Sequence, residues 1–158
     1  MTPAVETARR AGVPFELLSY AHDPAAESYG LEAAEALGLE PASVYKTLVA
    51  SVDGALAVAL VPVDRTLDLK ALASALGGRK AELAEAAAAQ RATGYVLGGI
   101  SPLGQRKTLP TVVHEDALLL PTIHVSAGRR GLELALAPAD LVRLTGARTA
   151  AIARQSAR

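Results

Sequence analysis

A lysine near the start of an apolar run is the residue whose type and place best suit binding chemistry. Lys46 lies in the segment Val44-Tyr-Lys-Thr-Leu-Val49, which is rich in residues typical of strands. Because side chains alternate along a strand, Val44, Lys46 and Leu48 are expected on one face. Such a lysine is either an edge residue whose ammonium extends into water, or a cation at the mouth of a pocket that binds a phosphate or a carbonyl oxygen. The spacing alone favours the edge residue.

Two glycine-containing loops offer backbone chemistry. Gly98-Gly-Ile-Ser-Pro-Leu-Gly104 runs into Gln105-Arg-Lys107, and Ser126-Ala-Gly-Arg-Arg-Gly131 follows a predicted strand later in the chain. Adjacent glycines let the backbone approach a ligand and turn amide N–H groups toward an anion or oxyanion. Glycines are equally common in tight turns that only connect two strands. Both loops are therefore candidate walls of one pocket, with simple chain turns as the alternative.

The residues needed for covalent or metal catalysis are missing or poorly placed. The chain has no cysteine, which excludes thiolate nucleophiles, disulfides and sulfur-ligated zinc. His22, His114 and His124 lack a local metal-ligand spacing. Ser101 precedes Pro102, which has no N–H to give to an oxyanion, so Ser101 is a poor acyl-forming nucleophile. No phosphate-loop or dinucleotide motif occurs, and we expect neither a metal nor a cofactor.

The composition is that of a globular protein. The chain has 158 residues, of which 51% are apolar and 20% charged, and we expect a single domain over residues 1–158. Sixteen basic residues balance sixteen acidic ones, which argues against binding to DNA or long RNA but permits contact with one or two phosphates. No apolar run reaches membrane-spanning length and no signal-like segment begins the chain, so we expect a cytoplasmic protein without membrane contact.

Apolar periodicity and turn residues predict an α+β fold with a mixed sheet. Its clearest element is a hairpin in which Asp53-Gly54 joins two strands. The predicted helices cover residues 3–11, 31–37, 68–76, 82–89 and 138–144. The predicted strands cover residues 14–20, 45–52, 55–63, 111–114, 122–126, 132–137 and 148–153.

Several segments together match a known family, and they run through nearly the whole chain. They are Tyr20-x-His-Asp-Pro24, Val44-Tyr-Lys-Thr-Leu48, Leu67-Asp-Leu-Lys70, Thr93-Gly-Tyr95, Gly98 to Gly104, and Val125-Ser126. On these residues the chain resembles the YbaK/EbsC family of free-standing aminoacyl-tRNA deacylases, most closely its bacterial Cys-tRNA(Pro) branch. The resemblance implies a strongly curved, barrel-like mixed sheet flanked by helices, a fold shared with the editing domain of bacterial prolyl-tRNA synthetase.

The resemblance also implies which residues act. The family's essential lysine falls on Lys46, and Tyr20 is a second residue implied to be catalytic. The family's acidic residue is usually aspartate and is here Glu133, whose side chain is longer by one methylene. The residues implied to bind substrate are Tyr29, Thr47, Gly98, Gly99, Ser101, Ser126 and Glu133.

By resemblance, the reaction is hydrolysis of the ester that links cysteine to the 3′ end of proline tRNA. Either the substrate's own thiol attacks the ester carbonyl or a water does, and the sequence does not separate the two. The implied partners are the acceptor end of tRNA(Pro) and prolyl-tRNA synthetase. Two alternatives remain: a deacylase for another small residue such as alanine, and a non-catalytic module that binds tRNA or a synthetase.

Overall fold

The hairpin predicted at Asp53-Gly54 lies at the centre of the fold. In the computed structural model, which describes residues 1–156, β2 (Tyr45–Val52) and β3 (Ala55–Pro62) pair antiparallel along their whole length. Asp53 and Gly54 both have positive φ angles, of 51° and 86°, as two-residue hairpin turns of the favoured type require. The predicted turn chemistry is thus confirmed.

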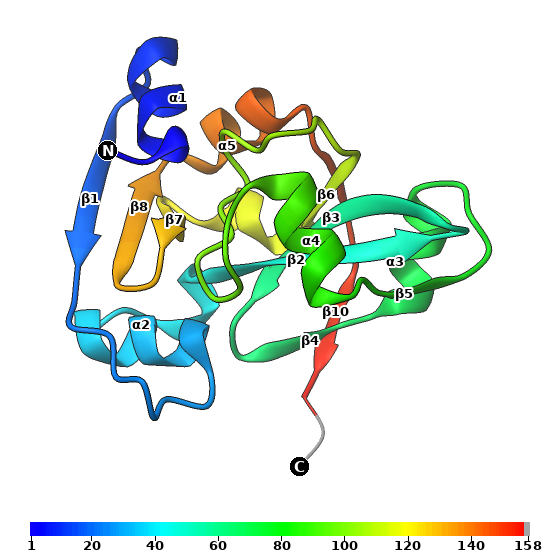
Figure 1. Cartoon of the computed structure of the whole chain (residues 1–158), viewed down its shortest axis with the longest axis horizontal. Coiled ribbons are helices and arrows are strands. Elements are labelled where there is room, and N and C mark those ends of the chain that lie inside the picture. The colour runs from blue at the N-terminus through cyan, green and yellow to red at the C-terminus, as the bar shows by residue number, and fades with distance from the viewer. Residues whose placement is uncertain (157–158) are drawn as a thin grey trace.

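The described strands form three hydrogen-bonded sheets, and the largest of them contains this hairpin (Figure 1). The five-stranded sheet adds β5 (Ala81–Leu83) beside β2, β6 (Thr111–His114) beside β3, and β9 (Arg148–Ala150) beside β6. The pairing is mixed, because β3–β6 and β6–β9 are parallel whereas β2–β3 and β2–β5 are antiparallel. This mixed arrangement confirms the predicted α+β class.

The second sheet carries part of the site described below. It is antiparallel, with β8 (Leu132–Leu136) between β1 (Phe15–Ser19) and β7 (Ile123–Arg129). A single parallel bridge between Val44 and His124 joins the end of this sheet to the start of β2. The third sheet pairs β4 (Arg65–Leu67) with β10 (Ala153–Gln155).

The helices begin and end at the residues that local chemistry favours. Thr2, Ser28 and Asp68 each accept a hydrogen bond from the first turn of the helix that follows. Among residues 1–156 no helix is long and apolar enough to cross a membrane. The helices are α1 (Pro3–Ala11), α2 (Tyr29–Leu37), α3 (Leu69–Ala75), α4 (Ala86–Thr93) and α5 (Pro138–Thr145), with 3₁₀ turns at Pro41–Ser43 and Glu115–Leu119.

Apolar side chains cover both faces of the central hairpin. On one face Tyr45 and Val49 pack with residues of α1, α4, β7 and β8, in a core that lies between the two larger sheets. On the other face Leu48 and Ala50 pack with α3 and the segment near Ile152. Because both faces are covered, β2 and β3 read as almost continuous apolar runs.

Three predictions about the elements need correction. The predicted helix over residues 82–89 is wrong in its first part, because Ala81–Leu83 pairs with the free edge of β2 and the helix begins only at Ala86. The predicted edge strand over residues 148–153 is divided between β9 and β10, which belong to different sheets. A single barrel-like sheet is not confirmed, since the described strands form three sheets.

Gly104 allows the long loop after α4 to pack against the start of α1, and this close approach gives a testable prediction. Its φ is +69°, and a Cβ there would lie 2.6 Å from the Pro3 carbonyl carbon and oxygen. We expect Gly104→Ala to lower the free energy of unfolding by more than about 2 kcal/mol, because left-handed strain adds to a clash with backbone.

Gly146→Ala is the matched control for this substitution. Gly146 has nearly the same φ, +65°, but nothing lies within 4 Å of its Cβ position. We therefore expect only the strain of about 1 kcal/mol. Urea denaturation of both variants measures the difference, and equal losses would mean that the contact with Pro3 has no energetic weight.

Candidate active site

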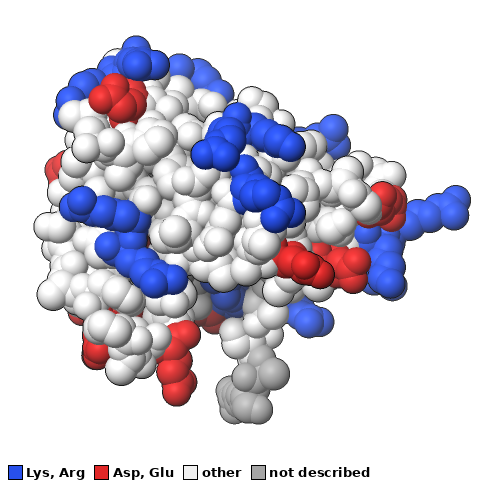
Figure 2. Space-filling model, in the orientation of Figure 1, with Lys and Arg blue, Asp and Glu red and all other residues white. Residues whose placement is uncertain are grey.

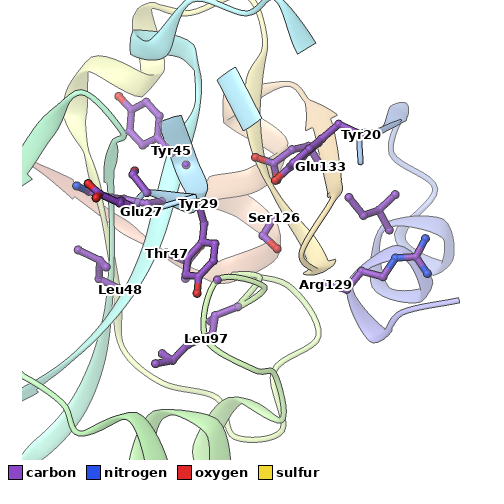
Figure 3. A pocket seen from close by; sticks show the side chains of 16 residues that line it. Tyr20, Glu27, Tyr29, Tyr45, Thr47, Leu48, Leu97, Ser126, Arg129 and Glu133 are labelled. Atoms are coloured by element: carbon purple, nitrogen blue, oxygen red, sulfur yellow. The ribbon is translucent and has the colours of Figure 1, made fainter. Parts of the chain in front are cut away.

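One cavity gathers most of the residues singled out in the sequence. Its volume is about 350 Å³, within the range of small-molecule sites, and it lies where the start of α2, strand β2, the glycine loop and the β7–β8 hairpin meet (Figure 3). The side chains and backbone that line it belong to Tyr20, Glu27, Ser28, Tyr29, Gly30, Tyr45, Lys46, Thr47, Leu48, Leu97, Gly98, Ile100, Ser126, Arg129, Leu132 and Glu133.

Lys46 lines this cavity from the second position of β2. Its side chain is half-buried, and within residues 1–156 its ammonium has neither a hydrogen-bond acceptor nor a carboxylate within salt-bridge distance. Burial lowers the pKa of Lys46 from its usual value, while the nearby charge of Asp64 opposes that shift. A partly desolvated cation without a protein partner is suited to binding an anion or a developing oxyanion.

Tyr20, Ser126 and Glu133 form the opposite wall. Ser126 and Glu133 are directly paired across β7 and β8, so their side chains lie on the same face of the sheet. Tyr20 follows β1 and donates its backbone N–H to Gly131 O at 3.0 Å, which fixes it beside the β7–β8 turn. Figure 3 shows the Tyr20 and Glu133 side chains next to one another at the cavity.

Glu133 is a buried acid. Only 6% of its surface is exposed, and this burial raises the pKa of its carboxyl to about 8. The pKa of Tyr20 is also raised, first by burial and then by the charge that Glu133 carries once it ionises. At neutral pH both groups are therefore protonated, and both offer an O–H donor toward the cavity.

The glycine loop contributes backbone to the cavity at Gly98. Gly98 has a φ of +82°, and a Cβ there would lie 2.7 Å from the Tyr29 ring. Its amide N–H has no acceptor within residues 1–156, whereas the N–H of Gly99 donates to Val96 O at 3.0 Å. Gly99 instead packs against the backbone of Arg129. Of the two adjacent glycines, Gly98 is thus the one with a free donor.

A contact between Tyr29 and Arg130 holds the loops around the cavity together. The guanidinium of Arg130 lies 4.7 Å from the centroid of the Tyr29 ring, and its Nε donates to Leu97 O at 2.8 Å. The other neighbour of Tyr29 is His22, whose ring centroid is 5.7 Å away and whose Nδ1 lies 2.8 Å from Glu32 Oε1. Three separate segments are therefore linked at this end of the cavity.

Thr47 presents an unsatisfied polar atom at the cavity. Its Oγ1 is buried and has no hydrogen-bond partner within residues 1–156, although the residue lines the cavity. A buried hydroxyl without a partner is costly, so it favours a bound group that can pair with it. Tyr45 Oη is also buried and has no hydrogen-bond partner in the described part of the chain, and burial raises the pKa of this hydroxyl well above its usual range.

The structure places Ser101 outside this cavity. Ser101 is fully buried, and its Oγ accepts a hydrogen bond from the Leu103 N–H while its carbonyl accepts one from Gln105 Nε2. These bonds shape the loop, and the side chain has no access to a ligand in the cavity. Of the residues predicted to bind substrate, Ser101 and Gly99 therefore do not line it, and the others do.

Sequence reasoning missed Glu27 as a residue that lines the cavity, and it named Arg129 and Arg130 only as part of a loop that could form a wall. Glu27 lies in the loop before α2, where its neighbours carry no recognisable pattern. Arg129 and Arg130 do lie in the second glycine-containing loop, whose basic pair was the available signal. Among residues 1–156 no group of three or more acidic or histidine side chains is arranged to hold a metal ion.

Comparison with known proteins finds a matching family and a similar protein. A model of the aminoacyl-tRNA editing domain matches residues 23–144. A protein of Enterococcus faecalis (strain ATCC 700802 / V583), named as a candidate Cys-tRNA(Pro)/Cys-tRNA(Cys) deacylase, EbsC, is 41% identical over 121 residues, which are 75% of this chain and 73% of that protein.

Solved structures show the same fold. A crystal structure of a candidate trans-editing enzyme for prolyl-tRNA synthetase superimposes with a TM-score of 0.79 at 26% identity, covering 98% of this chain and 99% of that one. The crystal structure of a hypothetical protein gives a TM-score of 0.86 at 25% identity, covering 97% and 100%.

The matched region includes the cavity residues from Glu27 to Glu133 and the whole central hairpin. The resemblance seen in the sequence segments is therefore confirmed by an independent family model and by a relative that shares two fifths of the aligned residues. This chain belongs to the aminoacyl-tRNA editing domain family.

Proposed function

We propose that this chain is a deacylase that acts in trans on mischarged tRNA and releases cysteine from Cys-tRNA(Pro). The relative from Enterococcus faecalis carries a name of this kind, and the site has the parts that such a reaction needs. Its partners would be the acceptor end of tRNA(Pro) and prolyl-tRNA synthetase. Because these partners are cytoplasmic, the protein would act in the cytoplasm. No metal or cofactor takes part in the proposed reaction.

The observation that carries this proposal is the half-buried ammonium of Lys46, which lines the cavity and has no ion-pair partner among residues 1–156. Hydrolysis of an ester develops negative charge on the carbonyl oxygen, and preorganised donors stabilise that charge. Lys46 Nζ and the N–H of Gly98, which has no acceptor among residues 1–156, would be such donors, since both residues line the cavity. The protonated Tyr20 and Glu133 can bind the ribose or the leaving oxygen.

In the thiol-assisted version, the substrate supplies its own nucleophile. The cysteine sulfur forms a bond to the ester carbonyl carbon, the bond from that carbon to the ribose oxygen breaks, and the thiol proton ends on the ribose hydroxyl. Water then opens the resulting thiolactone to free cysteine. The protein contributes positioning and charge stabilisation, and positioning alone can supply several kcal/mol.

In the competing version a water molecule attacks the ester, oriented by Lys46 or Tyr20. The protein then needs to position the water as well as the ester. The two versions differ in what they require of the substrate, because alanine and serine have no thiol. Steric selection in a small pocket discriminates weakly among small side chains, so a thiol requirement would provide most of the specificity.

A panel of charged tRNA(Pro) tests the function and separates the versions. We expect Cys-tRNA(Pro) to be deacylated at least about a hundredfold faster than the Ser- and Ala-charged forms, since one absent reacting group removes the main route. The measurement is release of labelled amino acid, with and without prolyl-tRNA synthetase. Release of serine as fast as cysteine would exclude the thiol-assisted route. Faster release of alanine would mean that the protein is an alanine deacylase. No release from any charged tRNA would favour a non-catalytic binding module.

A further inference from the structure

Equal numbers of acidic and basic residues do not mean an even distribution of charge. From Ala86 to His114 the chain has three basic residues and no acidic one, and residues 117–132 have two basic residues and no acidic one. All five are exposed, and none forms a salt bridge within residues 1–156. We call this set the basic strip: Arg91, Arg106, Lys107, Arg129 and Arg130.

Contacts of one loop connect two groups of cations within the basic strip. The backbone N–H groups of Arg106 and Lys107 donate to Thr93 O and Ala92 O, each at 3.0 Å, which holds this pair beside the end of α4 that carries Arg91. At the other end of the same loop, Leu97 O accepts the hydrogen bond from Arg130 and Gly99 packs on Arg129. The loop from Gly94 to Lys107 therefore joins the two groups of cations.

The space-filling view shows the result. Figure 2 shows basic side chains in two groups on one face, over α4 and its following loop and over the β7–β8 turn, with uncharged surface between them. Acidic side chains on this view lie toward the outline of the molecule, except for one acidic group that borders the basic group over α4. Arg129 lines the cavity itself, so the strip begins at the proposed site of the ester and extends away from it.

We propose that the basic strip binds backbone phosphates of the acceptor-stem duplex of the charged tRNA. This inference rests on the proposed function, which puts the 3′ end of the tRNA in the cavity that Arg129 lines. Phosphate contacts fix the register of a duplex without reading its sequence. The strip also explains how a protein of zero net charge binds a polyanion: it concentrates its unpaired cations on the side where the duplex lies.

Binding of uncharged tRNA at several salt concentrations tests the strip without requiring hydrolysis. Each lost phosphate contact lowers the slope of log K against log salt by about 1, so Arg106→Gln combined with Lys107→Gln is expected to lower it by about 2. Affinity at low salt should fall by about tenfold or more. The matched control is Arg79→Gln with Lys80→Gln, which removes two exposed cations near the turn of the β2–β3 hairpin and should change neither quantity.

A second substrate separates the strip from the cavity. The cysteinyl ester of adenosine fills the cavity but has no stem, so the double variant should cleave it at the wild-type rate while losing kcat/KM on full Cys-tRNA(Pro). Three results would each contradict the proposed role of the basic strip. They are unchanged tRNA binding by the double variant, an equal loss of tRNA affinity in the control variant, and an equal loss of kcat/KM on the short ester. The wild-type protein could cleave neither substrate while the double variant still has a lower slope of log K against log salt. That result would support the basic strip as a tRNA-binding surface and contradict the deacylase function.

Discussion

Lys46→Ala is expected to reduce the deacylation of Cys-tRNA(Pro) by at least about a hundredfold, which is the loss typical when one donor to an oxyanion is removed. The ammonium has no partner within residues 1–156, so the substitution breaks no ion pair or hydrogen bond of the folded protein. Release of labelled cysteine in single-turnover conditions is the measurement, and the thermal midpoint of unfolding should stay close to that of the wild type.

Two further substitutions control for this result. Lys46→Met keeps the length and the apolar part of the side chain and removes the charge, so it should be as inactive as Lys46→Ala. Lys80→Ala removes an exposed lysine near the hairpin turn and should retain full activity. Activity retained in Lys46→Met would show that the side chain acts by packing, and activity retained in Lys46→Ala would remove the residue from the mechanism.

Glu133→Gln is expected to abolish a large pH dependence of stability. The pKa of Glu133 is about 8 in the folded protein against 4.5 in the unfolded chain, because burial disfavours the charged form. Between these values the folded protein binds more protons than the unfolded chain, so stability falls as the pH rises. The difference in unfolding free energy between the variant and the wild type should therefore grow by about 1.4 kcal/mol per pH unit over this window, to a total on the order of 5 kcal/mol.

Urea denaturation of both proteins at intervals from pH 4.5 to 8.5 measures this difference. Glu16→Gln, on the exposed side of β1, shows whether the loss of any carboxyl has the same effect. Activity provides a second measurement, because a neutral Glu133 is the form that glutamine mimics: wild-type activity should fall above pH 8 while the variant keeps its rate. A difference that does not change with pH would mean that Glu133 is ionised in the folded state at neutral pH.

The fold was predictable where short-range chemistry decides it. The Asp53-Gly54 turn depends on adjacent residues, and the structure confirms it. The caps Thr2 and Asp68 likewise act on backbone N–H groups within four positions of them. The segment over residues 82–89 was mispredicted because its alanine-rich composition favours a helix, whereas pairing with the distant edge of β2 adds strand hydrogen bonds to Ala81–Leu83. The helix propensity of this segment gives no information about its pairing with β2.

The site was predictable as a set of residues but not as an arrangement. Resemblance pointed to Tyr20, Lys46, Ser126 and Glu133, and the cavity brings all four together. Ser101 was in the same set, yet hydrogen bonds inside its own loop keep it away from the cavity. A sequence segment shared with a family does not show which of its side chains face a ligand and which stabilise the loop.

The amino-acid sequence by itself determined the central hairpin, the helix caps, the absence of a cysteine nucleophile and the identity of the lysine at the site. These depend on residue type and on neighbours a few positions away. Only the tertiary structure decided that Glu133 is buried beside Tyr20, and that Gly98 rather than Gly99 has an N–H without an acceptor in the described part of the chain. It also decided that one loop brings together the exposed cations of the basic strip, none of which is in a salt bridge within residues 1–156. Burial and electrostatic environment depend on segments brought together by strand pairing across more than a hundred residues, such as β1 with β8, and no local pattern encodes them.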